Sequence, residues 1–213
     1  MSISENQARE SIVATARSLF ERGLTHGSTG NISVRLGSDW LVTPTGASFG
    51  SLDPARISRL DSDGKLLAGD PPSKEAVLHQ AMYQQRPSAG AVVHLHSVHS
   101  VAASVMADVD PANVLPPLTA YYVMRIGSLP LVPYHPPGDR KLAEAVRAYA
   151  GRHHALLLAN HGPVVAGSSL SAATDAVEEL EATARLFVML RGQACRCLDV
   201  AQVEELRRRY PPG

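Results

Sequence analysis

His94 and His96 stand two residues apart at the end of an apolar run that begins at Ala91. Side chains at positions i and i+2 of a β-strand point to the same face, so this spacing places both imidazoles on one side of the chain. Neutral imidazole is a common ligand for Zn²⁺ and related cations. A His-x-His pair also fits an ordinary surface histidine pair, so other residues must decide whether it binds a metal ion.

Two other stretches supply candidate ligands. Glu75 lies at the opening of a predicted helix just before the histidine strand, and its carboxylate is either a fourth ligand or a base. His161 follows the apolar residues 156–159 in an Asn-His-Gly turn beyond the end of a predicted strand, a place that commonly carries functional side chains. Three histidines and one carboxylate form a compact, nitrogen-rich site that suits Zn²⁺ and tolerates Mn²⁺, Co²⁺ or Fe²⁺.

Short loops rich in glycine and hydroxyl side chains could hold an anion. Residues 27–31 and 43–46 adjoin predicted strands, and Ser73 begins a predicted helix. Backbone N–H groups, hydroxyls and a helix N-terminus are the groups that bind a phosphate monoester. The same residue types also build ordinary turns. Next to a metal site, they favour a small phosphorylated substrate.

Composition limits the possible partners. We expect one domain over residues 1–213, because 45% of the chain is hydrophobic and no change of composition divides it. Twenty basic and 20 acidic residues leave a formal net charge of zero, which argues against binding to nucleic acid or an anionic membrane. Arg207, Arg208 and Arg209 form the only basic cluster, which we expect at a solvated helix end.

The cysteines and the lack of long apolar runs indicate a cytoplasmic protein. No apolar run approaches the roughly 20 residues that cross a bilayer, and the start of the chain does not resemble a secretory signal. Cys195 and Cys197 are the only cysteines, and a disulfide between residues two apart would be strained. We therefore expect free thiols in a reducing compartment.

Hydrophobic periodicity predicts helices on both sides of a sheet. Helices are expected over residues 4–23, 73–85, 98–106, 141–149 and 171–190, the first opening with a Ser4/Gln7 capping box. Strands are expected over 32–36, 40–43, 57–60, 65–68, 129–133, 155–159 and 164–166, and from residue 91 to the histidine pair. The strand at 32–36 is expected to be half-buried, and Glu178, Glu179 and Glu181 are expected on the wetter side of the last helix. The order of elements predicts an α/β fold with three layers, α/β/α, around a mixed and largely antiparallel sheet.

Five short motifs occur in an order that resembles the class II aldolase/adducin family. They lie at residues 30–35, 43–46, 73–75, 94–96 and 160–162, and the similarity runs from about residue 8 to 190. Each motif is modest alone, but the five together are specific. The resemblance implies an α/β/α fold, a divalent metal ion held by three histidines and often a glutamate, and a homotetramer with active sites near subunit interfaces.

The resemblance also implies roles for individual residues. It makes His94, His96 and His161 the metal ligands, and makes Glu75 both a ligand of the resting site and the group that accepts or donates a proton. Positions that hold substrate phosphate in the family are matched or adjoined by Asn31, Thr45, Gly46 and Ser73.

Further segments indicate which branch of the family the chain resembles. Lys74 replaces a serine that is typical of aldolases resembling fuculose-phosphate aldolase, and residues 116–127 and 133–139 are more similar to the branch that decarboxylates 3-oxo-tetronate 4-phosphates. The expected reaction is therefore metal-dependent loss of carbon dioxide from a sugar-acid phosphate to give dihydroxyacetone phosphate. Retro-aldol cleavage of a ketose 1-phosphate is the alternative, and a non-catalytic adducin-like interaction module is a remote one.

Both reactions leave an electron pair beside a carbonyl, which a divalent cation stabilises as a Lewis acid. Glu75 is expected to handle the proton, with its pKa raised by its surroundings. An aldolase needs one more acid or base, and Tyr121 is the nearest match to the tyrosine that a neighbouring subunit supplies in the aldolases, while Tyr210 is a weaker candidate. Lys74 and Arg125 are candidates for binding carboxylate or phosphate, although each also fits a solvated surface charge.

The remaining histidines are expected to be bystanders. His99 fits a packing or capping role better than ligation. The others show no partner pattern and are expected at the surface or at an interface: His26, His79, His135, His153 and His154.

Overall fold

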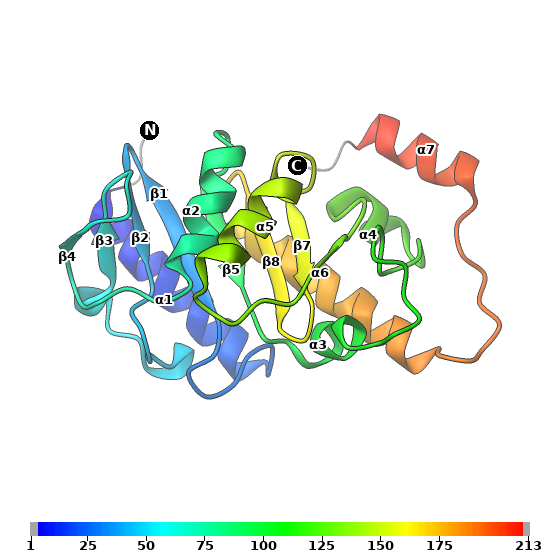
Figure 1. Ribbon diagram of the computed structural model, residues 1–213, viewed down its shortest axis with the longest axis horizontal. Helices are drawn as coiled ribbons and strands as arrows, with labels where there is room; N and C mark the ends of the chain where they lie inside the picture. Colours follow the sequence, from blue (N-terminus) through cyan, green and yellow to red (C-terminus); the bar gives the residue numbers. More distant parts are fainter. Residues whose placement is uncertain (1–3, 211–213) are drawn as a thin grey trace.

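An eight-stranded sheet forms the centre of the computed structural model, which describes residues 4–210 (Figure 1). Its strands are β1 (Asn31–Leu36), β2 (Asp39–Val42), β3 (Ser58–Leu60), β4 (Leu66–Ala68), β5 (Ala91–His94), β6 (Leu131–Val132), β7 (Ala155–Leu158) and β8 (Gly162–Gly167). They lie in the order β4-β3-β2-β1-β5-β8-β7-β6. Only the pair of β6 and β7 is parallel among these strands, so the prediction of a mixed, largely antiparallel sheet is confirmed.

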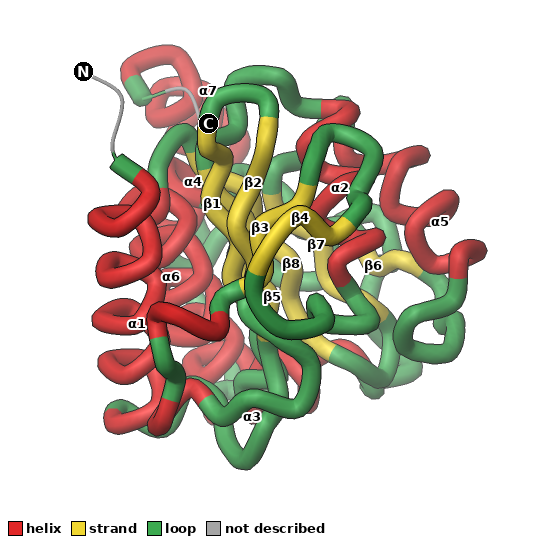
Figure 2. The backbone as a smooth tube through the Cα atoms, turned by 90° about the vertical axis from the view of Figure 1, so that its left-hand side faces the viewer, coloured by secondary structure: helices red, strands yellow, loops and turns green. Residues whose placement is uncertain are grey.

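Helices cover both faces of the sheet. They are α1 (Glu5–Glu21), α2 (Ala76–Gln85), α3 (Val98–Ser104), α4 (Ala120–Arg125), α5 (Arg140–Ala150), α6 (Leu170–Met189) and α7 (Val200–Arg209), with short 3-10 turns at Phe49–Ser51 and Pro54–Arg56. Figure 2 shows α1 and α6 on one face and α2 and α5 on the other. A separate hydrophobic core lies under each pair, which confirms the three-layer α/β/α fold.

The ends of the helices match the sequence signals unevenly. The Ser4/Gln7 capping box at the start of α1 is present. The short helix α4, which Thr119 caps, was not predicted from periodicity because its six residues are too few to show a helical repeat. Arg207, Arg208 and Arg209 occupy the last turn of α7, as expected for a solvated helix end. Among the helices of residues 4–210, none has the length and apolar character needed to cross a membrane.

Strand β1 is buried on both faces, not half-buried as its alternating pattern suggests. Ile32 and Val34 belong to the core on the α1 side. Asn31 and Ser33 alternate with them and face α2, where Ser33 is fully buried and bonded to side chains of that helix. A strand in the middle of a sheet that helices cover on both sides exposes neither face. Its polar side chains therefore need internal partners.

Helix α2 begins at Ala76, three residues later than predicted. Residues 73–75 form a turn instead, in which Ala76 N donates to Ser73 O at 3.0 Å. The turn is fastened to the loop after β2, because Ser73 N donates to Thr43 O and Thr45 N donates to Pro71 O. Glu75 therefore precedes the helix, and its side chain is directed toward the sheet.

Glu181 is buried, which corrects the prediction that it lies on the wetter side of α6. Its exposed fraction is 8%, and its carboxylate caps the start of α3. Oε1 accepts from the backbone N and the ring Nδ1 of His99 at 2.9 and 2.8 Å. Oε2 accepts from the N and Oγ of Ser100 at 2.9 and 2.7 Å. His99 thus serves in a cap, as expected, and Glu181 anchors the segment that follows the histidine pair.

We expect Glu181→Ala to lower the free energy of unfolding by about 3 kcal/mol at pH 7, because it leaves several buried donors without an acceptor. Burial raises the pKa of Glu181, but the donors from Ser100 and His99 outweigh burial and hold the pKa below its ordinary value of 4.5. A carboxyl with a depressed pKa stabilises the fold above pH 4.5 and loses that contribution as the pH falls through the folded pKa. Urea unfolding at pH 7 and pH 4 should therefore show a smaller difference between wild type and variant at pH 4.

The control is Glu178→Ala, which removes a partly exposed carboxylate that pairs with Arg22. We expect it to cost about 0–1 kcal/mol. Equal losses in the two variants at pH 7 would contradict the capping role of Glu181.

Candidate metal centre

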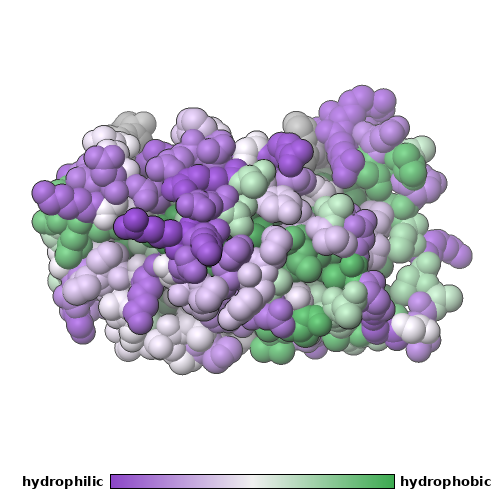
Figure 3. All heavy atoms as spheres, viewed as in Figure 1, coloured by the Kyte–Doolittle hydropathy of each residue, from purple (hydrophilic) through white to green (hydrophobic). Residues whose placement is uncertain are grey.

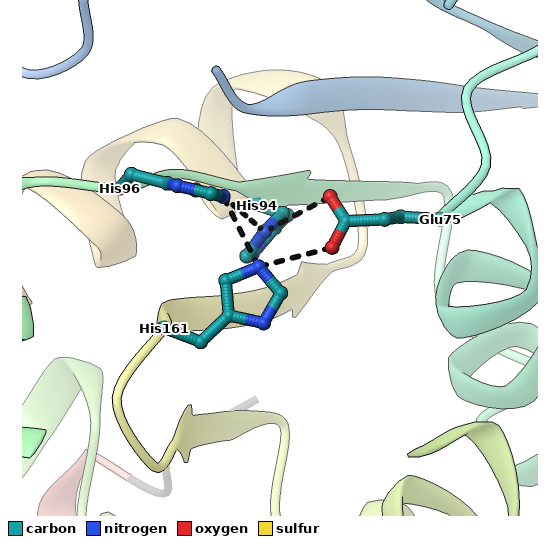
Figure 4. A group of neighbouring side chains, drawn as sticks. All are labelled: Glu75, His94, His96 and His161. Carbon is teal, nitrogen blue, oxygen red and sulfur yellow. Dashed lines mark hydrogen bonds and ion pairs between the residues drawn. The ribbon is translucent and has the colours of Figure 1, made fainter. Parts of the chain in front are cut away.

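Glu75, His94, His96 and His161 point toward one another where β5 ends and β8 begins (Figure 4). One ligand atom from each lies within 4.8 Å of all the others. His96 Nε2 is 3.1 Å from the Nε2 atoms of both His94 and His161. Glu75 Oε1 lies 3.0 Å from His161 Nε2, and Glu75 Oε2 lies 3.3 Å from His94 Nε2. The structure thus brings together the four residues that the sequence proposed as ligands.

The donor set fits a divalent cation. His94 Nδ1 lies 2.8 Å from Pro163 O and donates to it, so a neutral His94 directs the lone pair of Nε2 into the cluster. Glu75 Oε1 is buried and has no hydrogen-bond partner among residues 4–210. Tetrahedral Zn²⁺ with bonds of about 2.0–2.1 Å places neighbouring nitrogen ligands about 3.3 Å apart, close to the separations found here. A buried glutamate and three histidines in this arrangement are therefore consistent with a divalent metal site.

Backbone geometry that few residues tolerate places His161 in the cluster. Asn160 has a φ of 56°, a left-handed conformation that asparagine tolerates better than most residues. Gly162 has a φ of 155°, and a Cβ there would lie 2.2 Å from Leu95 O. Only glycine allows the His161 turn to approach Leu95, which lies between His94 and His96, so closely.

Glu75 and the histidines strongly influence one another's ionisation. Burial raises the pKa of Glu75, but His94 and His161 outweigh burial and hold that pKa well below its ordinary value. This differs from the expectation that the surroundings raise the pKa of Glu75. Burial lowers the pKa of His94, but the carboxylate of Glu75 outweighs it, so the pKa of His94 is raised. Burial, together with positive charge on His94 and His161, lowers the pKa of His96 to about 3, which keeps its lone pair free near neutral pH.

Asn31 and Ser73 adjoin the carboxylate of Glu75. Asn31 Nδ2 donates to Glu75 Oε2 at 2.9 Å and to Ser73 Oγ at 3.2 Å. Thr45 and Gly46 are exposed in the neighbouring loop, which is paired with the chain just before Ser73. Four of the expected substrate contacts therefore lie in one region beside Glu75.

A cavity of about 450 Å³ opens beside the exposed side of the histidine cluster. His96 and His161 line it together with His26, Val98, Val101, Tyr134, Pro137 and Asn160. Lys74 is exposed, and its Cβ lies 3.3 Å from the position that a Cβ on Gly138 would take, next to the cavity-lining Pro137. Lys74 therefore lies near the rim of the cavity.

Tyr121 and Arg125 lie on α4, away from the histidines of the same chain. They line a different hollow with Asp175, Glu178, Glu179 and Ala182 of α6, and Arg125 pairs with Asp175 at 3.1 Å. Tyr210 is exposed at the end of α7, a helix that packs against α4. Within residues 4–210 of one chain, none of the three is among the residues that line the histidine cavity.

Sequence reasoning missed several residues near the site. His79 was expected at a surface or interface, but it is fully buried between Asn31 and Ser33; His154 is also buried, bonded to Arg125 O. The spacing of His79 and Tyr83, four residues apart, could have revealed that they share one face of α2. Tyr134 lines the cavity from a loop, and periodicity carries no signal for such a residue.

Comparison with known proteins identifies the family. The family model for the Class II Aldolase and Adducin N-terminal domain matches residues 10–188. The chain belongs to the class II aldolase/adducin family. It is 50% identical over 202 residues to the 3-oxo-tetronate 4-phosphate decarboxylase of Haemophilus influenzae, covering 94% of this chain and 96% of the relative. The L-fuculose phosphate aldolase of Escherichia coli K12 is 35% identical over 87% of this chain and 85% of its own length.

Solved structures agree with the fold of this class II aldolase/adducin chain. The crystal structure of YgbL from Escherichia coli, described as an aldolase/epimerase/decarboxylase, superposes with a TM-score of 0.93 at 46% identity. The match covers 95% of this chain and 99% of YgbL. The recognised motifs and the whole fold therefore point to the same family.

We expect Gly162→Ala to destabilise the fold by about 2–4 kcal/mol and to lower the metal content of the purified protein, because a Cβ there would collide with Leu95 O and displace His161. Unfolding curves and metal analysis measure the two effects. Gly151→Ala is the control, since its Cβ would meet only ordinary contact with Gln85, and it should retain wild-type values. Full metal content in Gly162→Ala would show that the close approach does not position His161.

Proposed function

We propose that the chain is a metal-dependent carbon–carbon lyase that decarboxylates a 3-oxo-tetronate 4-phosphate to dihydroxyacetone phosphate and carbon dioxide. The observation that carries this proposal is the buried cluster of Glu75, His94, His96 and His161 in a chain half identical, over nearly its whole length, to an enzyme of that name. The lower identity to L-fuculose phosphate aldolase makes retro-aldol cleavage the weaker candidate.

His94, His96 and His161, with Glu75, would hold the metal ion. A divalent cation there supplies Lewis-acid stabilisation of the negative charge that develops on the substrate oxygens when carbon dioxide leaves. Three nitrogens and one carboxylate favour Zn²⁺, with Mn²⁺, Co²⁺ or Fe²⁺ as alternatives. A neutral imidazole is required at each position, and burial supports this for His96.

Glu75 handles the proton that replaces carbon dioxide on the substrate carbon. While it lies between the imidazoles, its pKa is held low, but burial acts in the opposite direction. When substrate displaces Glu75 from His94 and His161, burial remains and the lowering influence weakens, so the carboxyl can carry a proton near neutral pH. Glu75 then donates this proton to the carbon and returns to its ionised form.

Substrate anions are bound by groups around the cavity. Asn31, Thr45, Gly46 and Ser73 are assigned to the phosphate, because their amide, hydroxyl and backbone donors lie in one region beside Glu75. Lys74, at the rim of the cavity, supplies a cation for the carboxylate or phosphate.

Arg125 and Tyr121 can reach a substrate only from a neighbouring copy, given their place on α4. In that copy, Tyr121 is the proton-transfer residue that the aldolase alternative requires.

The same proposal includes assembly and location. Residues 1–213 form one domain of a cytoplasmic homotetramer with sites near the subunit interfaces and no nucleic-acid or membrane partner. Exposed apolar side chains support subunit contact. Val98 at the start of α3 and Val105 just after it are 60% and 53% exposed, and Leu66 and Leu67 form an apolar edge at β4 (Figure 3). The free, exposed thiols of Cys195 and Cys197 agree with a reducing compartment.

Removing the metal ion is expected to lower the melting temperature, because a cation that binds only the folded chain stabilises it. Chelator treatment followed by dialysis should lower it, and adding Zn²⁺ should restore it. His96→Ala should bind Zn²⁺ much more weakly and show little of this shift, measured by calorimetry. His135→Ala is the control, because His135 is not part of the cluster, and it should respond like wild type. A chelator that leaves the wild-type melting temperature unchanged would argue against a metal centre.

Purified, metal-loaded protein should release carbon dioxide and dihydroxyacetone phosphate from one configuration of 3-oxo-tetronate 4-phosphate. Glu75→Gln should lower kcat by about 10²- to 10⁴-fold, the usual contribution of a positioned acid or base. Coupled assays of both products measure the rate, with Glu144→Gln as a matched control outside the cluster. Failure to release carbon dioxide from either isomer, together with cleavage of a ketose 1-phosphate, would replace this proposal with the aldolase reaction.

A further inference from the structure

A continuous line of buried, hydrogen-bonded side chains connects Tyr83 on α2 to Glu75. His79 and Tyr83 lie four residues apart on α2, Glu75 comes just before this helix, and Asn31 and Ser33 lie two apart on β1. The two sets interdigitate. Tyr83 Oη lies 2.8 Å from Ser33 Oγ, Ser33 Oγ lies 2.6 Å from His79 Nδ1, and His79 Nε2 lies 2.5 Å from Asn31 Oδ1.

The last link of this line joins Asn31 to Glu75. Asn31 Nδ2 lies 2.9 Å from Glu75 Oε2. The exposed fractions are 2% for Asn31, 0% for Ser33 and His79, 7% for Tyr83 and 8% for Glu75. Each polar group therefore depends on its neighbour in the line for hydrogen bonding.

The chemistry of the groups sets one direction of donation. An ionised carboxylate only accepts, so Glu75 requires the NH₂ of Asn31 to face it. The amide oxygen of Asn31 then faces His79, whose Nε2 must carry a proton. A neutral His79 has no proton left for Nδ1, which accepts from the hydroxyl of Ser33. Ser33 Oγ in turn accepts from Tyr83, so every donor in the line points toward Glu75.

We propose that His79 is a positioning residue: its Nε2–H fixes the amide of Asn31 so that the NH₂ group holds the carboxylate of Glu75. This assignment rests on the proposed function, in which Glu75 both adjoins the metal ion and handles the proton. Without the donor from His79, the amide of Asn31 can turn over and present its oxygen to the carboxylate, which repels it. His79 thus acts on the reaction through Asn31 and touches neither substrate nor metal ion.

The protonation states of the line agree with this geometry. Burial lowers the pKa of His79 to about 3, so its ring is neutral near neutral pH and can donate from one nitrogen while accepting at the other. Burial raises the pKa of Tyr83, which keeps its hydroxyl as a donor. A fully satisfied buried network of this kind is rigid and specific.

The tautomer of His79 is the first test. NMR of full-length protein with ¹⁵N-labelled histidine and bound Zn²⁺ distinguishes a protonated ring nitrogen from an unprotonated one. The His79 signals are assigned by their absence from the spectrum of His79→Gln. We expect a protonated Nε2 and a bare Nδ1. An Nδ1–H tautomer overturns the proposal, whether or not any variant folds.

Two variants separate the donor toward Asn31 from the acceptor toward Ser33. In His79→Gln the side-chain NH₂ reaches the place of Nε2, so the donor is retained. In His79→Asn the shorter amide reaches only the place of Nδ1, so the donor to Asn31 is lost. We expect kcat/KM and Zn²⁺ affinity to fall about 10- to 100-fold in His79→Asn, and less than about threefold in His79→Gln.

A control and a second readout keep this inference distinct from the proposed function. His153→Asn removes a partly exposed histidine that is bonded to Ser128, and it should match wild type in both measurements. If His79 had only a packing role, kcat/KM and Zn²⁺ affinity would fall equally in His79→Gln and His79→Asn, and this result would overturn the proposal. If wild type releases no carbon dioxide, the proposed function fails, while the tautomer and the Zn²⁺ affinities of the two variants still decide the role of His79.

Discussion

The carboxylate of Glu75 is buried between the sheet and the start of α2. A buried ionised carboxylate is stable only when hydrogen bonds and nearby positive charge replace the hydration that it loses. Asn31 donates to one oxygen, and His161 and His94 lie beside the two oxygens at 3.0 and 3.3 Å. One oxygen still lacks a hydrogen-bond donor within residues 4–210. The neighbourhood thus holds the carboxylate in place and leaves one oxygen available, which is consistent with a cation beside it.

Backbone contacts fix much of the position of His94 and His161 in this cluster. Pro163 O accepts both from Leu95 N at 3.2 Å and from the ring of His94 at 2.8 Å. One carbonyl therefore holds the two chain segments together and selects the tautomer of a ligand. The backbone of Gly162 lies against Leu95, which brings the His161 turn to the same place. These contacts at the end of β5 and the start of β8 hold His94 and His161 beside each other.

The sequence predicted the layers, the sheet and the four clustered residues, since each depends on local periodicity or on motifs. It placed Ser33 on a half-exposed strand and Glu181 on a wet helix face, and both assignments were wrong for one reason. Alternation and amphipathicity report which residues are polar, but they do not report that a polar side chain is buried beside a tertiary partner. His79 was misplaced for the same reason, because its partners Asn31 and Ser33 come from a strand more than forty residues earlier. Tyr121 and Arg125 matched family segments, but their position relative to the histidines depends on how α4 packs against α6.

The cavity walls bear on which carbon–carbon bond is broken. His96 and His161 face a hollow that polar residues line in part and whose apolar walls are Val98, Val101 and Pro137. A substrate carboxylate next to these apolar side chains loses part of its hydration, whereas carbon dioxide is neutral and loses little. Apolar surroundings therefore favour the conversion of a carboxylate into carbon dioxide, provided that a cation near the histidines stabilises the charge left on the substrate. Retro-aldol cleavage requires in addition a proton-transfer group near the departing aldehyde, a role that the aldolase alternative gives to Tyr121 of a neighbouring copy. Under the proposed function, loss of carbon dioxide thus uses groups of one chain, whereas the aldolase alternative also needs a residue from a neighbouring copy.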